Sequence, residues 1–272
     1  MMRAVFLSDN ISHCQLDSEW GLSIWIAYNG HHILLDTGAG PLFAENADAL
    51  GIDLADVEFG VLSHAHYDHA DGMGEFFRRN DHAPFYLRSA CGEDCYDHEA
   101  DGNWKYVGIR RGLLKTHRDR IVYLDHTFSP LSGVILLPHT TENLMEKGVK
   151  AHMFRQTPCD MVPDDFDHEQ SLLFTTDRGL VIFNSCCHAG ADVVVNEAAA
   201  AFPDLPIYAI IGGFHLYDTP ETEVRAFARR LRETGVEHII TGHCTGEEGF
   251  FILKEELGER VRQTEVGLEL EL

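Results

Sequence analysis

Three histidines and one carboxylate stand within six consecutive positions of this chain, and this cluster constrains the fold more than any other feature. Its four ligand-type residues are His64, His66, Asp68 and His69. The apolar run at 59–62 before it predicts a buried strand, and the pattern at 73–79 after it predicts a helix. The cluster therefore lies on a strand-to-helix loop, where a rigid scaffold can aim several side chains at one point. Because imidazole and carboxylate groups bind zinc and similar divalent ions, the sequence predicts a metal site here.

The size and charge of the chain narrow the classes of function. Its 272 residues suffice for a large core without disulfides and fit a single domain, residues 1–272. The formal net charge of −23 argues against nucleic acid and against an anionic membrane surface as partners, because both require clustered Lys and Arg. A small anionic substrate bound by a local basic patch is compatible with this charge. The oligomeric state is left open.

The cysteines and the apolar runs predict a cellular location. Seven cysteines, an odd number without a disulfide-scaffold pattern, indicate reduced thiols in a cytoplasmic protein. No apolar run approaches the roughly 18 residues that a membrane span needs. Residues 1–10 lack the long apolar region of a secretory signal, so we expect neither export nor membrane insertion.

Short apolar or alternating runs predict strands in both halves of the chain. They lie at 3–7, 22–28, 32–35, 59–62, 84–87, 134–137, 171–175, 180–184, 207–211 and 238–241. Further helices are predicted at 191–201, between Pro220 and Gly235, and at 247–257. The weakly alternating segment 261–272 is interpreted as a terminal strand. This order favours an α/β (α+β) fold with two facing sheets that are covered outside by helices.

The segment at about 89–129 shows little regular pattern and is interpreted as an insertion with at most one short helix. It holds six of the 21 basic residues of the chain, all between Lys105 and Arg120. Because arginine binds phosphate through a bidentate fork, we expect Arg110 and Arg111 to bind an anionic part of the substrate. The alternative is a solvated surface that offsets acidic neighbours.

Motifs that follow one another along the chain resemble those of the metallo-β-lactamase superfamily. The marker sequence His-x-His-x-Asp-His is filled at all four positions by the cluster at 64–69. The segment 34–38, Leu-Leu-Asp-Thr-Gly, resembles the first motif of the superfamily, and His188 and His243 are placed like its later histidine motifs. The resemblance covers nearly the whole chain. It implies a four-layer αββα sandwich with the metal site at one edge, between the two sheets.

Four further segments are similar to one branch of that superfamily, typified by dihydropterin-methyl-ribofuranosylaminobenzene-phosphate synthase, an archaeal enzyme of methanopterin biosynthesis. They are His-Glu-Gln-Ser-Leu at 168–172, Cys-Cys-His-Ala-Gly at 186–190, Gly-Gly-Phe-His-Leu at 212–216 and Gly-His-Cys-Thr-Gly at 242–246. The superfamily resemblance implies hydrolysis as the usual chemistry. The branch resemblance implies, as an alternative, a pterin-related transfer that forms a C–N bond.

The spacing of the cluster predicts how its side chains divide between two ions. The first two histidines are two positions apart, so in an extended segment they share one side and can bind the same ion. The aspartate and the third histidine lie just beyond and can face a second ion. His188 is the expected third ligand of the first ion, with His168 as the alternative. His243, which follows the strand at 238–241, is the expected partner of the second ion.

One departure from the superfamily pattern concerns a bridging aspartate, often found as Gly-Asp at the end of a later strand. The comparable place here reads Asn-Ser-Cys-Cys-His at 184–188 and has no carboxylate. Either His188 or a cysteine therefore takes this role, or the second metal is weak or missing. Zn²⁺ is the default ion from the ligand types, in one or two copies, and iron or manganese fits nearly as well.

Three residues are predicted to act beside the metal ligands. Asp36 is interpreted as an outer carboxylate that orients a ligand histidine. Asp68 either ligates the metal or orients a water molecule and accepts its proton. His215, which follows the strand at 207–211, is a candidate for substrate contact or proton transfer, and a loop histidine without a catalytic role is the alternative.

The expected function is a metal-dependent hydrolase that acts on a small anionic, phosphorylated molecule. A divalent metal lowers the pKa of bound water from about 15.7 towards roughly 7, so that metal-bound hydroxide is available at neutral pH. The first alternative is the C–N bond-forming transferase. The second is a non-catalytic metal-binding or ligand-sensing protein that keeps the same fold.

Overall fold

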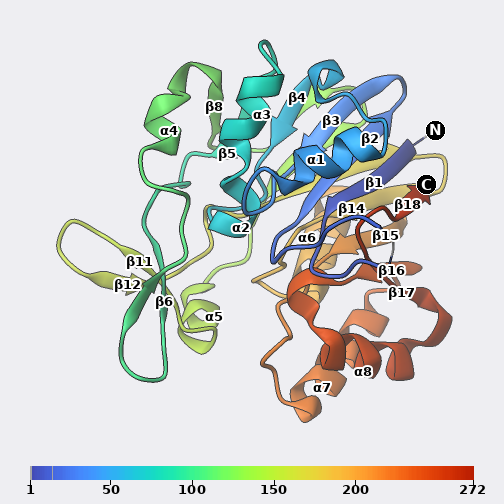
Figure 1. The fold of residues 1–272 in the computed structure, drawn as a ribbon. Helices are drawn as coiled ribbons and strands as arrows, with labels where there is room; N and C mark the ends of the chain where they lie inside the picture. The colour runs from blue at the N-terminus through green and yellow to red at the C-terminus, as the bar shows by residue number, and fades with distance from the viewer. Residues whose placement is uncertain (1, 14) are drawn as a thin grey trace.

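Two seven-stranded sheets packed face to face form the centre of this computed structural model, which describes residues 2–13 and 15–272 (Figure 1). The first sheet has the order β18-β1-β2-β3-β4-β5-β8. Its strands are β1 (Met2–Ser8), β2 (Ser23–Tyr28), β3 (His31–Leu35), β4 (Phe59–Val61), β5 (Phe85–Arg88), β8 (Ile121–Leu124) and β18 (Glu269–Glu271). From β3 to β8 the neighbouring strands in this sheet are parallel.

The second sheet has the order β17-β16-β15-β14-β13-β10-β9. Its strands are β9 (Phe128–Leu131), β10 (Val134–Pro138), β13 (Gln170–Thr176), β14 (Gly179–Phe183), β15 (Ile207–Gly212), β16 (His238–Thr241) and β17 (Val261–Gln263). From β14 to β17 the neighbouring strands are parallel. The carboxyl ends of parallel strands lie along one edge of a sheet, so loops that follow them are brought together.

Successive side chains of a strand point to opposite faces of its sheet, and here both faces are apolar. One face of each sheet packs against the other sheet, and helices cover the outer face. Phe6 of β1 and Phe183 of β14 belong to the core between the sheets, whereas their neighbours Leu7 and Ile182 pack in cores shared with helices. The longer helices are α1 (Leu42–Ala49) and α3 (Met73–Arg79) on the first sheet, and α6 (Ala191–Ala201), α7 (Glu221–Glu233) and α8 (Glu247–Leu257) on the second. This arrangement is the predicted four-layer αββα sandwich.

The remaining helical segments are short. They are the helices α2 (Tyr67–Ala70), α4 (Leu113–Thr116) and α5 (Met145–Lys150), and the 3₁₀ turns η1 (Leu54–Asp56), η2 (Arg118–Arg120), η3 (His243–Thr245) and η4 (Gly258–Arg260). Among the described residues, no helix combines the length and the apolar character that crossing a membrane requires.

A third, four-stranded sheet lies beside the sandwich and corrects the expectation of an irregular segment at 89–129 (Figure 1). Its order is β12-β11-β6-β7, with strands β6 (Cys95–His98), β7 (Trp104–Tyr106), β11 (Met153–Gln156) and β12 (Met161–Pro163). These strands have only three or four residues, too few for a clear alternating pattern. One pairing, between β6 and β11, joins segments 58 positions apart, as in Tyr96↔Phe154, and local periodicity cannot show it. The single domain with an insertion at 89–129 stays a prediction.

The strand predictions are otherwise confirmed, each within one residue at either end. The exception is the C-terminal segment 261–272, which was expected to form one strand. It forms two short strands instead, β17 at the edge of the second sheet and β18 at the edge of the first. The segment crosses from one sheet to the other and so helps to close one side of the sandwich.

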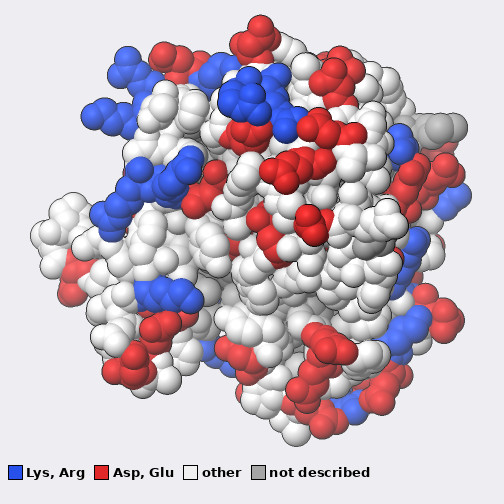
Figure 2. Space-filling model, in the orientation of Figure 1, with Lys and Arg blue, Asp and Glu red and all other residues white. Residues whose placement is uncertain are grey.

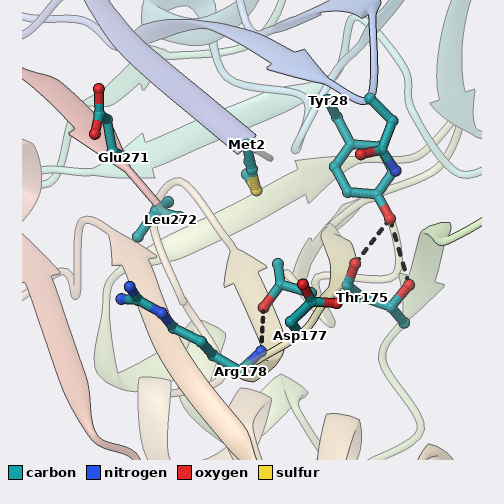
Figure 3. Close-up of a pocket in the computed structure, with 9 residues that line it drawn as sticks. Met2, Tyr28, Thr175, Asp177, Arg178, Glu271 and Leu272 are labelled. Atoms are coloured by element: carbon teal, nitrogen blue, oxygen red, sulfur yellow. Dashed lines mark hydrogen bonds between the residues drawn. The ribbon is translucent and has the colours of Figure 1, made fainter.

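A cavity of about 350 Å³ marks the edge of the sandwich where the parallel strands begin (Figure 3). Tyr28, at the end of β2, donates a hydrogen bond from its hydroxyl to the carbonyl oxygen of Thr175 in β13, at 2.7 Å. This bond joins the two sheets next to their hairpin turns. Since the hairpin turns of both sheets meet here, the carboxyl ends of the parallel strands in both sheets meet at the opposite edge.

The hairpin between β2 and β3 turns at Asn29-Gly30, a dipeptide that favours a type I′ turn. The two residues have φ values of 52° and 89°. We expect Gly30→Ala to lower the free energy of unfolding by about 1–2 kcal/mol, because a Cβ atom disfavours this left-handed backbone. A Cβ atom at position 30 meets no other atom within 4 Å, so steric overlap contributes nothing. Urea unfolding measures the effect, and Gly40→Ala, also in open space but without a positive φ, is the control.

Candidate metal centre

The residues predicted to form the site follow the carboxyl ends of parallel strands from both sheets. Asp36 follows β3, the 64–69 cluster follows β4, His188 follows β14, His215 follows β15 and His243 follows β16. Because these strand ends share one edge of the sandwich, residues more than 170 positions apart in sequence are brought within contact of one another. The nearly perpendicular rings of His69 and His243, for example, have centroids 4.9 Å apart.

Three histidines form the first group of the centre. One ring nitrogen from each of His64, His66 and His188 lies within 4.8 Å of the other two. All three Nε2 atoms are buried and have no hydrogen-bond partner among the described residues. Leaving buried polar atoms unpaired costs about 1–3 kcal/mol each, so three converging orphaned nitrogens indicate a ligand. A divalent metal with three protein ligands and one open position fits this arrangement.

His188 lies together with His64 and His66 in the first group, whereas His168 lies in another set within 4.8 Å, with His66, Cys95 and Asp164. The Nδ1 atom of His168 accepts a hydrogen bond from the backbone N–H of Ala65 at 3.2 Å, and its Nε2 atom lies 3.0 Å from the carboxylate of Asp164. Both ring nitrogens of His168 are thus occupied in supporting the loop behind the metal ligands. Sequence spacing alone left the two histidines as alternatives, because each lies next to a buried strand, His168 before β13 and His188 after β14.

The second group consists of Asp68, His69 and His243, which offer three ligand atoms within 4.8 Å of one another. The carboxylate oxygen Oδ2 of Asp68 lies 3.5 Å from Nε2 of His69 and 3.4 Å from Nε2 of His243. The Nε2 atom of His243 is buried and has no hydrogen-bond partner among the described residues. These residues fit a second divalent ion next to the first.

Two cysteines that the sequence reasoning did not assign also face the centre. The sulfur of Cys186 lies 3.3 Å from Nε2 of His69 and 3.3 Å from the sulfur of Cys244. The neighbouring Cys187 turns away and its thiol donates to the carbonyl oxygen of Asn184. The adjacent pair of cysteines in the sequence did not show which one faces the ions, because this depends on the positive φ of 46° at Cys187.

Asp36 holds two of the histidines, as predicted for an outer carboxylate. Its Oδ2 atom accepts hydrogen bonds from Nδ1 of His69 at 2.8 Å and from the hydroxyl of Ser63 at 2.7 Å. The same hydroxyl lies 2.8 Å from Nδ1 of His64. Each Nδ1 atom is thereby occupied, which fixes the ring orientation and leaves Nε2 for the metal.

We expect Asp36→Asn to weaken zinc binding about 10- to 100-fold, the usual cost of removing an outer partner of a metal-binding histidine. Asp36 has a φ of 57°, a conformation that asparagine tolerates, so the substitution removes the charge with little backbone strain. Competition with a chromophoric chelator measures the affinity. Asp81→Asn, at a fully exposed carboxylate, should leave it unchanged. Equal affinities for both variants would contradict the orienting role.

The other two outer partners were not predicted. The Nδ1 atom of His243 lies 2.9 Å from the amide oxygen of Asn10, in the loop after β1. The Nδ1 atom of His188 contacts the carboxylate of Glu169, which also accepts from His139 at 2.8 Å. No sequence spacing links these residues to their histidines. Glu169 stood within one of the branch motifs, and this was the one available signal.

A buried chain of alternating charges extends from His188 into the protein. His139 lies between two carboxylates, 2.8 Å from Glu169 and 2.8 Å from Glu197. Burial by itself would lower the pKa of His139, but hydrogen bonds to the two glutamates raise this pKa to about 10. Burial would raise the pKa of Glu169, but His188 and His139 hold it well below its usual range. Both groups are therefore charged at neutral pH.

The two groups of ligands open into a cavity of about 280 Å³. Its walls include His215, whose ring centroid is 4.8 Å from that of His188 and whose buried Nδ1 atom has no hydrogen-bond partner among the described residues. Trp20 and Tyr217 line the same cavity, and both are nearly half exposed. Lys105 of β7 contributes a positive charge. The site thus combines metal-binding groups, a histidine, aromatic rings and a cation.

Arg110 and Arg111, which were predicted to bind the substrate, lie outside this cavity. Both are exposed, and the guanidinium of Arg111 stacks over the ring of Tyr106 at 4.7 Å. The backbone N–H of Arg110 donates to the carboxylate of Asp71. Figure 2 shows Lys and Arg side chains gathered over α3 and α4, on the surface of the first sheet's outer layer. Lys105, in β7 at the start of the same basic segment, lines the cavity, whereas the two arginines follow β7 and lie at the surface.

A second cavity, of about 360 Å³, adjoins the first and shares His188 and His215 with it. It lies between α5 and α7, and its lining includes Lys147, Phe214 and Phe227. The two histidines therefore stand in the wall between two separate spaces, each large enough for part of a small molecule.

Comparison with known proteins places this arrangement in a family. The sequence matches the model of the metallo-beta-lactamase superfamily over residues 21–243. It is 25% identical to the 7,8-dihydropterin-6-methyl-4-(beta-D-ribofuranosyl)-aminobenzene-5'-phosphate synthase of Methanocaldococcus jannaschii. The aligned region has 264 residues and covers 92% of this chain and 89% of that protein. The structure of a metal-dependent hydrolase of the beta-lactamase superfamily is similar, with a TM-score of 0.85 and 28% identity over 100% of this chain and 99% of that one.

A metallo-beta-lactamase fold protein from Bacillus subtilis shares the fold, with a TM-score of 0.59 and 10% identity over 100% of this chain and 99% of that one. The family model covers most of the chain, and the ordered motifs converge at one edge of an αββα sandwich, as the resemblance implied. This protein belongs to the metallo-β-lactamase superfamily.

Proposed function

We propose that this protein is a hydrolase with a two-metal centre that acts on a small anionic, phosphorylated molecule. The observation that carries the proposal is the set of three Nε2 atoms, from His64, His66 and His188, that have no hydrogen-bond partner among the described residues and lie within 4.8 Å of one another. His66 and His188 of this set line the cavity together with Asp68. A purely structural histidine cluster would pair these nitrogens within the protein. Zinc is the ion expected from the ligand types, and iron or manganese is the alternative.

A divalent ion at this site, when bound, polarises a phosphoryl or carbonyl oxygen and lowers the pKa of a coordinated water towards about 7. Asp68 is placed to orient the attacking water and to hold its proton. Burial by itself would raise the pKa of Asp68, but His69 and His243 hold it below its usual range, so the group is an anion at neutral pH. The carboxylate can therefore accept a hydrogen bond from the nucleophile throughout the neutral range.

The cavity walls supply the remaining groups. Lys105 provides a positive charge for an anionic part of the substrate, in place of the predicted Arg110 and Arg111. His215 has a buried Nδ1 atom with no hydrogen-bond partner in the described part of the chain, and its ring centroid is 4.8 Å from that of His188. It is placed to give a proton to a leaving group. A relative with 28% identity is a metal-dependent hydrolase, which supports the same type of chemistry here. The predictions of a cytoplasmic location and of no nucleic-acid partner belong to this proposal.

The test is a substrate screen of the zinc-loaded protein with simple phosphodiesters, lactones and thioesters. We expect turnover of at least one class with water as the only co-substrate, and loss of that turnover in Asp68→Ala and His64→Ala. Zinc content measured by elemental analysis accompanies each assay. A protein that binds no divalent ion, or that keeps its cellular role after both substitutions, would contradict an enzymatic metal centre.

The second candidate function is a transferase that forms a C–N bond in pterin metabolism. The observation that favours it is the pair of adjoining cavities that share His188 and His215, since a two-substrate reaction needs a space for each partner. A relative with 25% identity is named as a 7,8-dihydropterin-6-methyl-4-(beta-D-ribofuranosyl)-aminobenzene-5'-phosphate synthase, a name that joins a pterin and an aryl amine. A dihydropterin with a diphosphate leaving group and an aryl amine acceptor, supplied together and separately, test this function. Product formation that requires both compounds would favour the transferase over the hydrolase.

A further inference from the structure

The charge of the ligand set leaves a place for another anion. Within the described residues, the first group offers three histidines and the second offers two histidines and the carboxylate of Asp68. Two divalent ions carry four positive charges, and Asp68 is the single carboxylate among these ligand atoms, since Asp36 and Glu169 compensate charge only from behind His69 and His188. Buried charges are stable only when they are paired or coordinated, so a second anionic ligand is expected between the two ions.

Cys186 occupies the position between the two groups. Its sulfur lies within 4.8 Å of ligand atoms of both His64, in the first group, and His69, in the second. The distance to Nε2 of His69 is 3.3 Å, and the side chain is fully buried. A second set within 4.8 Å joins the same sulfur to His243 and Cys244. Among the described residues, Cys186 is the one side chain that can carry a negative charge and that lies within 4.8 Å of histidine ligand atoms from both groups.

The surrounding backbone is built to hold sulfur at this point. A Cβ atom at Gly213 would lie 2.5 Å from the sulfur of Cys244, so a side chain there would displace it. The backbone N–H of His215 donates to the sulfur of Cys244 at 3.2 Å, and that sulfur contacts Cys186 at 3.3 Å. The loop after β15 therefore fixes the sulfur of Cys244, and that sulfur contacts the sulfur of Cys186.

We propose that Cys186 supplies a thiolate that bridges the two metal ions, in the place of a bridging carboxylate, with Cys244 positioned beside it as a hydrogen-bonding neighbour. This inference rests on the two-metal centre of the proposed function and adds a ligand to it. A bridging thiolate makes the site softer, so it favours zinc or iron over magnesium or calcium. A shared sulfur ligand would hold the two ions next to Asp68, which lines the same cavity as Cys186.

Cobalt(II) loading of the full-length protein tests the proposal with a readout other than activity. A cobalt–thiolate bond gives a sulfur-to-metal charge-transfer band in the near ultraviolet, which nitrogen and oxygen ligands do not. We expect the wild-type protein to bind two equivalents of cobalt and to show this band. Cys186→Ser should lose the band and bind the second equivalent at least tenfold more weakly. Cys186→Asp should keep two equivalents and lose the band.

Cys187→Ser is the matched control, because Cys187 is adjacent and equally buried but points to Asn184 and away from the ions. It should keep both the band and the stoichiometry, and Cys244→Ser should keep the band. Circular dichroism of the metal-free variants verifies that each is folded. Two bound equivalents without the band in the wild-type protein, or a band that survives in Cys186→Ser, would overturn the bridging thiolate and leave the proposed function standing. A wild-type protein that binds no cobalt would overturn the proposed function itself.

Discussion

His188→Ala is expected to release the metal ion from the first group and to lower turnover by at least about 100-fold. Removing a partner behind a ligand histidine already costs 10- to 100-fold, so removing the ligand should cost more. The two remaining histidines of the group, His64 and His66, offer an ion only two nitrogens. The cavity left by the imidazole is open to solvent on the side of the 280 Å³ pocket, so water can fill it.

Metal-induced stabilisation provides the measurement. An ion present at 100 times its dissociation constant stabilises the folded state by about 2.7 kcal/mol, so zinc should raise the unfolding temperature of the wild type. The variant should lose most of this shift, and elemental analysis should find at most one ion. His152→Ala, in the neighbouring cavity but outside the ligand groups, is the matched control and should behave as the wild type. An unchanged zinc-induced shift in His188→Ala would refute the assignment of the first group.

His139→Ala is expected to lower the free energy of unfolding by about 3–5 kcal/mol near pH 6, the range for breaking a buried ion pair by removing one partner. The imidazolium of His139 separates Glu169 from Glu197, and all three side chains are at most 7% exposed. Without it, two carboxylates remain buried close together with less compensating charge. The substitution should also loosen the orientation of the His188 ring, because Glu169, which contacts Nδ1 of His188, would lose its hydrogen bond to His139.

The pH dependence of this effect has a definite sign. The pKa of His139 is raised from 6.5 to about 10, so its contribution to stability is fully present below pH 6.5 and is lost as the pH rises through about 10. The pKa values of Glu169 and Glu197 are lowered, so their contributions are present above pH 4.5 and are lost as the pH falls. The difference in stability between wild type and His139→Ala should therefore be largest between about pH 4.5 and 6.5 and should shrink towards pH 10.

Urea unfolding at a series of pH values, with metal removed, measures this difference. His126→Ala, in the turn after β8, is an exposed histidine that serves as the control and should change stability by less than about 0.5 kcal/mol at every pH. A difference that stays constant up to pH 10 would mean that the imidazole packs as a neutral group between the glutamates.

Two facing sheets covered by helices were predictable because local patterns indicate the strands and helices, and the resemblance to the superfamily implied their four-layer arrangement. The alternation of buried residues along β1 and β14 follows from the two-residue period of a strand, and the apolar spacing in α7 follows from the period of a helix. The β6–β7 and β11–β12 strands were missed for the converse reason. They are too short to show a period, and the two local pairs form one sheet only because β6 pairs with β11, which is remote in sequence.

The ligand cluster was predictable because its four residues share one loop, and Asp36 because it sits in a recognisable motif. His188 could be named only as one of two alternatives. The choice against His168 depended on Ala65 and Asp164, which occupy both nitrogens of that ring. Only the backbone conformation at Cys187 shows that Cys186, and not Cys187, faces the other ligands. The surface position of the arginines was not predictable either, because it depends on the hydrogen bond from the backbone N–H of Arg110 to Asp71 and on the contact of Arg111 with the ring of Tyr106.

The amino-acid sequence was enough to predict most of the strands and helices and the loop that carries the first ligands, because these follow from hydrophobic periodicity and from residues close together in the chain. The four-layer sandwich was implied by the resemblance of the ordered motifs to the superfamily, and the order of strands within each sheet is known only from the structure. The tertiary structure alone decided which distant side chains complete the centre, which outer groups orient them and which charges face the cavity. All three depend on how the two sheets pack, because this packing brings their strand ends together. The packing is stabilised by contacts between residues far apart in the sequence, which no local stretch of sequence contains.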